Sequence, residues 1–397
     1  MKIIVFSLCC LYCTVVFCQP PAVLTTPASS LRLFKEDLSK NNPHALDLVK
    51  RLRTAADSLL TMQPVSVMDK TFTPESGDKH DYMSQAPYFW YDSSKPNGKP
   101  YLRRDGQRNP EIYKITDRTY LGRLADASRL LALAWYAAGD EKYARKATAL
   151  LETWFINDAT RMHPNLDFGQ AIPGVNSGRG IGIIETVSLL QITDAAILLQ
   201  GSAAWTSMDA AALKNWFAAY LNWMLTSKNG RDEHAAKNNH GTWYFAQAID
   251  FALFTGDNSR ASSLLRESEV RLDSQLNADG RQPLELERTN GLGYSSMDLR
   301  GWCTVATLAA GPGVDLWQYT TSKGAGIKKA IDWLLPFALG RQPWIYQQIG
   351  HYNAAADFYP ILLQAALVYK DPTYREAAGT FQKQGSELAA SLVYYQR

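Results

Sequence analysis

The sequence has 397 residues, of which 46% are hydrophobic and 20% are charged, and its formal net charge is +3. This composition excludes an intrinsically disordered chain, and the charge is too small for a protein that binds nucleic acid over a broad surface. A chain of this length can form one large domain or two ordinary ones.

The first 18 residues, MKIIVFSLCCLYCTVVFC, predict a signal peptide, because Lys2 precedes an apolar run that ends before Pro20 and Pro21. A retained membrane anchor or a lipoprotein is the alternative. We therefore expect an exported protein, periplasmic or secreted, whose mature chain is residues 19–397. Of the five cysteines only Cys303 remains in that chain, so no internal disulfide can form. We expect no later segment that is apolar enough to span a membrane.

The segment 83–111, MSQAPYFWYDSSKPNGKPYLRRDGQRNPE, is too rich in Pro and Gly for a long helix. Long irregular loops in compact domains are usually functional or disordered, and the aromatic residues here argue against disorder. We predict a lid-like loop. Tyr88, Trp90 and Tyr91 could stack on sugar rings or could pack the loop onto the body of the protein.

Helical hairpins recur along the chain. Residues 121–155, 244–268 and 362–381 each have apolar residues at steps of three and four, and each is interrupted by a short polar turn. Convincing strand alternation is scarce. Repeated hairpins predict an all-α protein in which the hairpins stack into a solenoid or close into a toroid, as one domain over residues 19–397.

Three further segments are candidates for the rim of the same cleft as the lid-like loop. Residues 161–182 are irregular and precede a helix that we expect to start near Ile183; Arg179, between glycines, could bind a uronate or only form a turn. Residues 277–298 are also irregular. The third segment, KNNHGTWY (237–244), carries Asn238, Asn239 and His240 directly before an apolar helix.

Two residue pairs form a candidate catalytic set. Asn239 and His240 could hold a carboxylate, although Asn residues here could also act only as helix caps. Arg288 lies six residues before Tyr294, and a nearby guanidinium is expected to lower the pKa of a tyrosine so that it can act as a base. Arg288 could instead be a buried partner of Glu285 or Glu287. Such a set suits β-elimination from a uronic acid polymer, whereas a hydrolase needs two opposed carboxylates.

These segments resemble the alginate lyase superfamily, polysaccharide lyase families 5 and 38. The resemblance rests on KNNHGTWY with LELERTNGLGY (284–294), and on SQAPYFWYDSSKPNGKPY (84–101) and GRGIGIIET (178–186). It implies an (α/α) toroid that cleaves mannuronate- or glucuronate-containing chains without a cofactor, with Asn239 neutralising the carboxylate and His240, Arg288 and Tyr294 completing the catalytic set. The Arg-to-Tyr spacing is one residue shorter than in family 5, which favours family 38, a family active on glucuronan.

We therefore predict a polysaccharide lyase that acts on a β-1,4-linked polyuronate. Its partner is an acidic polysaccharide, and we expect no nucleic acid partner, no metal and a monomer. Candidate substrate contacts are Arg179, Tyr88, Trp90, Tyr91, Lys237 and Trp243. Two alternatives stay open: a toroidal glycoside hydrolase that uses Asp and Glu, and a helical protein that binds glycans without cleaving them.

Overall fold

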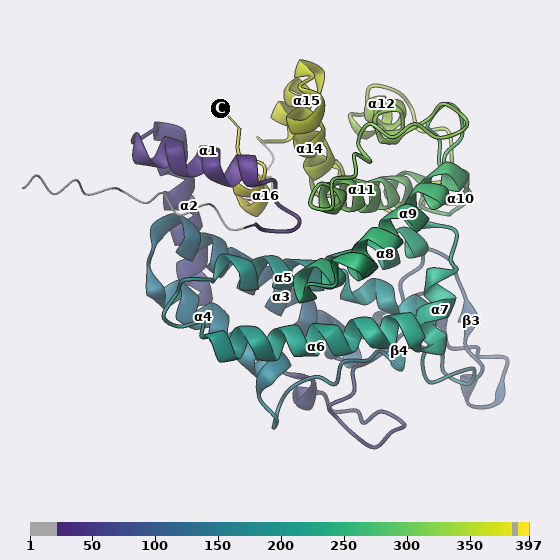
Figure 1. Ribbon diagram of the computed structural model, residues 1–397. Coiled ribbons are helices and arrows are strands. Elements are labelled where there is room, and N and C mark those ends of the chain that lie inside the picture. The colour runs from purple at the N-terminus through teal and green to yellow at the C-terminus, as the bar shows by residue number, and fades with distance from the viewer. Residues whose placement is uncertain (1–21, 383–387, 397) are drawn as a thin grey trace, which may run out of the picture.

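The computed structural model describes residues 22–382 and 388–396, and most of them are helical (Figure 1). The predicted signal peptide lies outside the described residues. The α-helices are α1 (Ala28–Ser39), α2 (Pro43–Leu59), α3 (Asp117–Ala138), α4 (Glu141–Leu151), α5 (Leu189–Leu198), α6 (Ser207–Thr226), α7 (Lys228–His234), α8 (Asn239–Thr255), α9 (Asn258–Gln275), α10 (Pro283–Leu286), α11 (Gly291–Ala309), α12 (Ile327–Ala338), α13 (Ala354–Asp357), α14 (Tyr359–Tyr369), α15 (Pro372–Gln382) and α16 (Leu388–Val393). Four short strands are β1 (Met83–Gln85), β2 (Phe89–Trp90), β3 (Leu102–Arg103) and β4 (Phe168–Ala171).

The three predicted helical hairpins are present as α3–α4, α8–α9 and α14–α15. The first two turn at Gly139 and Gly256, whose φ angles of 70° and 90° are readily adopted by glycine. Asp140 and Asp257 then cap the second helix of each pair by accepting backbone N–H bonds. The third turn uses Lys370 in the left-handed conformation. Local turn chemistry therefore sets these hairpins.

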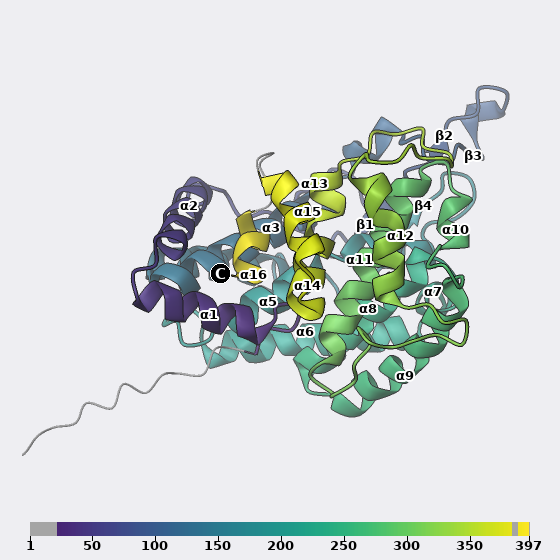
Figure 2. The same ribbon diagram turned by 90° about the horizontal axis from the view of Figure 1, so that it is seen from above.

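The hairpins form a ring with an inner and an outer layer (Figures 1 and 2). The inner helices α3, α5, α8, α11 and α14 contact one another in that order. Hydrogen bonds from Gln364 to Tyr394 and from Gln396 to the Leu363 carbonyl join α14 to the α16 segment, which contacts α3. Burial separates the layers, since 14 of 17 residues of α8 are buried but only 6 of 18 in α9. The all-α toroid prediction is confirmed.

The four irregular segments meet at one end of the ring. At the start of α3, Asp117 accepts a hydrogen bond from the Met83 amide. At the start of α8, Asn239 binds Glu285, and just before α11, Arg288 binds Asp105. The lid-like loop, residues 83–111, contains β1, β2 and β3. β1 pairs in parallel with β4, and β2 pairs with β3 in an antiparallel arrangement. The prediction that this segment is not a long helix is confirmed.

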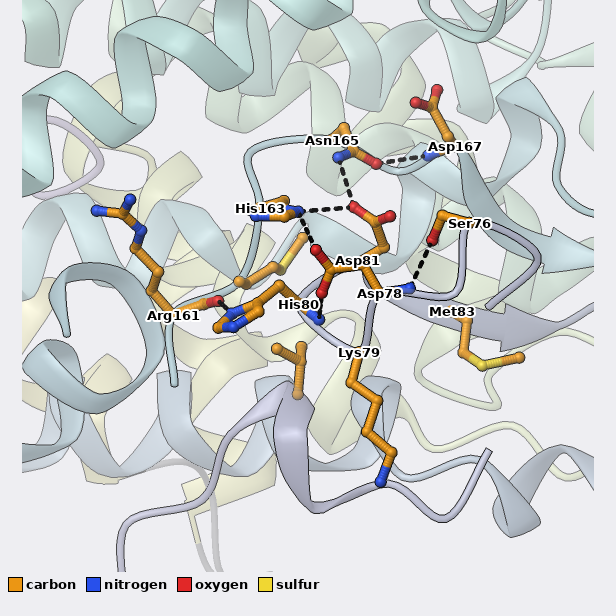
Figure 3. Close-up of polar contacts among 12 residues, drawn as sticks. Ser76, Asp78, Lys79, His80, Asp81, Met83, Arg161, His163, Asn165 and Asp167 are labelled. Carbon is orange, nitrogen blue, oxygen red and sulfur yellow. Dashed lines mark hydrogen bonds and ion pairs between the residues drawn. The ribbon is translucent and has the colours of Figure 1, made fainter. Parts of the chain in front are cut away.

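A polar clasp holds the chain before β1 against the chain before β4 (Figure 3). His163 Nδ1 lies 3.0 Å from Asp81 Oδ1 and 4.0 Å from Asp78 Oδ2. Asn165 donates to the same Asp81 oxygen, and the ring of His80 stacks on His163 at a centroid distance of 5.2 Å. These contacts therefore hold the start of the lid-like loop and the start of the segment that carries Arg179 against each other.

The structure refines two sequence predictions in this region. The helix expected near Ile183 begins earlier, as a 3₁₀ helix over Gly180–Thr186, and becomes α-helical only at Leu189. The stretch Gly180–Leu198 is also long and apolar enough to pass as a membrane span, with a mean hydropathy of 1.6. Since 67% of it is buried inside the protein, it is accounted for as a core element of the ring.

Candidate active site

Asn238 and Asn239 have different roles at the start of α8. The side chain of Asn238 is the N-cap and accepts a hydrogen bond from the His240 amide at 3.3 Å. Asn239 is 1% exposed, and its backbone N and side-chain Nδ2 donate to the two carboxylate oxygens of Glu285 at 2.6 and 2.7 Å. The capping role thus belongs to Asn238, and the amide of Asn239 is held in one orientation.

His240 is held in a similar way by a second buried carboxylate. Its Nδ1 lies 2.7 Å from Oε1 of Glu233, which is buried at the end of α7, while the imidazole is 16% exposed. A hydrogen bond from Nδ1 to the carboxylate leaves Nε2 as the free ring nitrogen. The pair therefore fixes both the ring orientation and the nitrogen that is open to a ligand.

Glu285 connects the two predicted residue pairs. It is bonded to Asn239, and the charges of Arg288 and His240 both act on it. Burial raises the pKa of Glu285, and the bonds from Asn239 act in the opposite direction. In the described chain, Oδ1 of Asn239 is buried without a hydrogen-bond partner. The sequence prediction that the Asn–His and Arg–Tyr pairs lie at one rim agrees with this arrangement.

Tyr294, in the first turn of α11, lies between a tyrosine and an arginine. Its hydroxyl is 2.8 Å from the hydroxyl of Tyr88 in the lid-like loop. The guanidinium carbon of Arg288 lies 3.9 Å from the centre of the Tyr294 ring. Arg288 also forms a two-pronged ion pair with Asp105, at 3.2 and 2.9 Å. The lid-like loop therefore supplies two partners to this pair.

The charge balance at Tyr294 differs from the sequence prediction. Burial raises the pKa of Tyr294, Tyr88 adds to the increase, and Arg288 lowers it only in part. Burial opposes the charge of Asp105, but the hydrogen bonds and charges of Arg288 and Arg103 lower the pKa of that carboxyl to about 2. Asp105 is thus ionised and offsets the guanidinium. The prediction that Arg288 lowers the pKa of Tyr294 below its usual value is therefore wrong.

Arg179 lies beside the lid-like loop, where the charge of Glu233, the partner of His240, also acts on it. Its guanidinium donates to Oε1 of Gln170 at 2.8 Å and lies 5.2 Å from the centre of the Phe89 ring. Burial lowers the pKa of Arg179. Its Nε is buried without a hydrogen-bond partner among the described residues, so the group has donor capacity in reserve.

The remaining predicted contacts are less closely tied to this cluster. Trp90 donates to the Gln107 carbonyl at 2.9 Å. Tyr91 is 52% exposed, and Lys237 is exposed at the turn before α8. Trp243 is 3% exposed and donates to the Met297 carbonyl, so the structure places it in the interior rather than at the rim.

Three carboxylates of the site were not predicted as site residues. Glu233 and Glu285 hold the His and the Asn, and Asp105 binds Arg288 in place of the expected Glu285 or Glu287. Asp105 is 183 positions from Arg288, so no local pattern could indicate the pair. Within residues 22–382 and 388–396 no group of three or more His, Cys, Asp or Glu side chains could hold a metal ion.

The comparisons with known proteins agree with this geometry. The alginate lyase family model matches residues 66–344. The crystal structure of an alginate lyase from Bacteroides ovatus superposes with a TM-score of 0.89 and 38% identity, covering 95% of this chain and 100% of that chain. The sequence has no match among the curated proteins with which it was compared.

Two more distant structures share the fold. A variant of alginate lyase A1-III in complex with a tetrasaccharide has a TM-score of 0.58 and 18% identity, over 88% of this chain and 94% of that chain. Alginate lyase A1-III from Sphingomonas species A1 has a TM-score of 0.56 and 15% identity, over 87% and 94%. With the family match and the 38% identical relative, these findings show that the chain belongs to the alginate lyase family and is a polysaccharide lyase.

Proposed function

We propose that this lyase cleaves a β-1,4-linked polyuronate, alginate or glucuronan, by β-elimination at the Asn239, His240, Arg288 and Tyr294 cluster. The observation that carries the proposal is Glu285, which binds Asn239 while the charges of Arg288 and His240 act on it. One buried carboxylate thereby joins a carboxylate-binding pair to a proton-transferring pair. The relatives of known structure are alginate lyases, and one was solved with a tetrasaccharide.

In this proposal Asn239 and His240 neutralise the carboxylate of the sugar whose C5 is attacked. Loss of the C5 proton places negative charge on that carboxylate. Donors aimed at developing charge can lower the activation free energy by roughly 3–4 kcal/mol. The donors are the second N–H of Asn239 Nδ2 and, in the imidazolium form of His240, its Nε2–H. Glu285 and Glu233 fix both side chains in advance, so little reorganisation is needed.

Tyr294 is the proposed base and acid. As phenolate, its oxygen takes the C5 proton, the C4–C5 double bond forms, and the C4–O4 bond breaks. The same hydroxyl then gives the proton to the departing O4, so the protons balance over one cycle. Such proton transfer is worth about 10²–10⁴ in rate. Arg288 lowers the cost of the phenolate and acts against burial and Tyr88, which both raise the pKa of Tyr294.

Stereochemistry limits the substrates of a single tyrosine. In mannuronate and glucuronate, the C5 proton and O4 lie on the same face, so one residue can serve both. Guluronate has the opposite configuration at C5 and needs a base on the other face, for which His240 is the candidate. The choice between mannuronan and glucuronan depends on contacts to the C2 hydroxyl.

The hydrolase alternative is weaker on the same geometry. A hydrolase needs two carboxylates facing each other across the bond, one of them with a raised pKa. Here the buried Glu233 and Glu285 already bind His240 and Asn239. We also propose export by the predicted signal peptide, which mass measurement of the mature protein would test.

Ultraviolet absorbance during incubation with polymannuronate, polyguluronate and glucuronan tests the proposal. Elimination creates the absorbing C4–C5 double bond, so we expect absorbance to rise with polymannuronate or glucuronan. New reducing ends without absorbance would replace elimination by hydrolysis. Binding of the polymers with no product would contradict the assignment of these substrates.

A further inference from the structure

A polar cavity that is distinct from the catalytic cluster lies among the inner helices. Its volume is about 310 Å³, and its lining comes from α3, α5, α8, α11, α14, α16 and Thr25. None of the four proposed catalytic residues lines it. Arg300, on its wall, follows Tyr294 by six residues on α11, which is about 9 Å further along the helix at 1.5 Å per residue.

Two arginines face this cavity from different helices. Arg129 comes from α3 and Arg300 from α11. Within the part of the chain that the structure describes, neither guanidinium has a carboxylate within 4.0 Å or donates a side-chain hydrogen bond to the protein. Arg300 lies 5.6 Å from the centre of the Trp243 ring, which holds it by a cation–π contact. The N–H donors of both guanidinium groups are therefore available to a ligand.

Two carboxylates lie nearby and reduce the positive potential. Asp194 feels the charge of Arg129 but is bound by the amide and hydroxyl of Thr25. Asp357 feels the charge of Arg300, and a hydrogen bond from the Asn353 backbone acts on its carboxyl. Because each carboxylate already has other donors and neither forms an ion pair with an arginine, the bidentate positions of both guanidiniums stay open.

The rest of the lining suits a sugar ring better than a bare inorganic ion. Trp243, Leu190 and Pro360 supply apolar surface, and Gln191 supplies an amide. Ser188 Oγ is buried without a hydrogen-bond partner in the described residues, so a ligand hydroxyl could satisfy it. A volume near the lower limit of small-molecule sites, about 300 Å³, admits one sugar rather than a chain.

We propose that this cavity binds a free uronate, or the terminal uronate of a short product, through Arg129 and Arg300. The ligand class rests on the proposed polyuronate substrate. The cavity is separate from the elimination site, so a uronate monosaccharide, which has no bond to cleave, can occupy it without any reaction.

Calorimetric titration of the wild-type protein with sodium D-glucuronate, D-glucose and sodium sulfate tests this site. We expect glucuronate to bind, glucose not to bind, and sulfate to bind more weakly than glucuronate. Arg129→Gln and Arg300→Gln should each weaken glucuronate binding roughly tenfold, as expected for the loss of a charged donor. Arg288→Gln, in the catalytic cluster, and the exposed Arg123→Gln, on the same helix as Arg129, should leave it unchanged.

Two results would overturn the proposal. Glucuronate binding that is lost in Arg288→Gln but kept in Arg129→Gln and Arg300→Gln places the ligand at the catalytic cluster. Sulfate that binds as tightly as glucuronate makes the cavity an anion site without sugar selectivity. If an arginine variant does not fold, Ser188→Leu fills the cavity and should also abolish binding. If glucuronate binds but the protein catalyses no elimination, only the proposed function is contradicted. If the protein catalyses elimination but glucuronate does not bind, only the cavity proposal is contradicted.

Discussion

At the scale of single residues, the direction of each hydrogen bond around Asn239 decides what the site can do. Both donors of Asn239 that face Glu285 are used, and both oxygens of Glu285 accept them. An amide could rotate by 180° and present either its oxygen or its nitrogen, but the carboxylate permits only one choice. Glu285 is therefore a positioning residue that acts through Asn239.

Reversing the polarity of this pair separates its structural and catalytic roles. In Glu285→Gln, the backbone N–H and the Nδ2–H of Asn239 face a single acceptor oxygen. We expect this variant to lose about 1–3 kcal/mol of stability and most of its activity. Adding Asn239→Asp restores the pairing, because Gln can donate to Asp and accept from the backbone amide. Melting curves should show recovered stability, while activity stays at least about 100-fold reduced, since a carboxylate now faces the substrate carboxylate. Recovered activity in the double variant would show that the amide is not required.

Asp105 sets the charge that Tyr294 experiences from Arg288. Its negative charge raises the pKa of Tyr294, and the base form of Tyr294 exists only above that pKa. In Asp105→Asn the pKa of Tyr294 should fall, so the rising limb of the kcat/KM profile should move to lower pH. Asp92→Asn, in the same loop, is the matched control: its carboxylate accepts hydrogen bonds from Ser94, and the variant should leave the limb in place. A shift to higher pH in Asp105→Asn would contradict this account of the charge balance.

At the scale of elements, a buried ion pair fixes the segment that leads into the lid-like loop. Lys70 Nζ lies 2.9 Å from Asp117 Oδ2 at the start of α3, and both side chains are fully buried. Lys70 also donates to the Val67 and Lys79 carbonyls at 2.7 Å. The ammonium therefore joins two parts of this segment to an inner helix.

Removing one charge of this pair should cost more than removing both. Lys70→Met leaves Asp117 buried without its cation, and we expect a loss of about 3–5 kcal/mol in the free energy of unfolding. Lys70→Met combined with Asp117→Leu should recover a large part of that loss. Urea unfolding of the three proteins measures this. Equal stability of Lys70→Met and wild type would mean that the pair does not hold the segment.

The sequence predicts elements whose signals are local and misses those that depend on distant partners. The turns at Gly139 and Gly256 could be read directly, because a glycine followed by an aspartate ends one helix and caps the next. The strand pair β1–β4 could not, since each strand has at most four residues and its partner lies far along the chain. Trp243 was misplaced because a one-turn step along α8 moves a side chain from the rim into the interior.

The candidate site shows the same limit. Asn239, His240, Arg288 and Tyr294 were identified from two short motifs and their resemblance to a family. The raised pKa of Tyr294 was not, because it depends on burial and on Tyr88 and Asp105 from the lid-like loop. The motifs identify the residues of the site, but the electrostatic environment of those residues depends on segments that only the folded chain brings together.

At the scale of the whole molecule, the net charge of +3 does not describe the rim, where arginines lie beside carboxylates such as Asp105. Arg103, Arg179 and Arg288 all lie around the rim, where a polyanion would bind. Salt screens such attraction over about 10 Å at 0.1 M and about 3 Å at 1 M. KM for polymannuronate or glucuronan should therefore rise several-fold with added NaCl while kcat changes little. A KM that is independent of salt would argue against this electrostatic role of the rim.

The most direct test of the central claim compares wild type with Tyr294→Phe on the polymer that wild type cleaves. Formation of the C4–C5 double bond is followed by absorbance, and polymer binding is measured in parallel by calorimetry. We predict that Tyr294→Phe binds the polymer with similar affinity but forms the double bond at least about 100-fold more slowly. Double-bond formation at the wild-type rate in Tyr294→Phe would contradict the assignment of Tyr294 as base and acid.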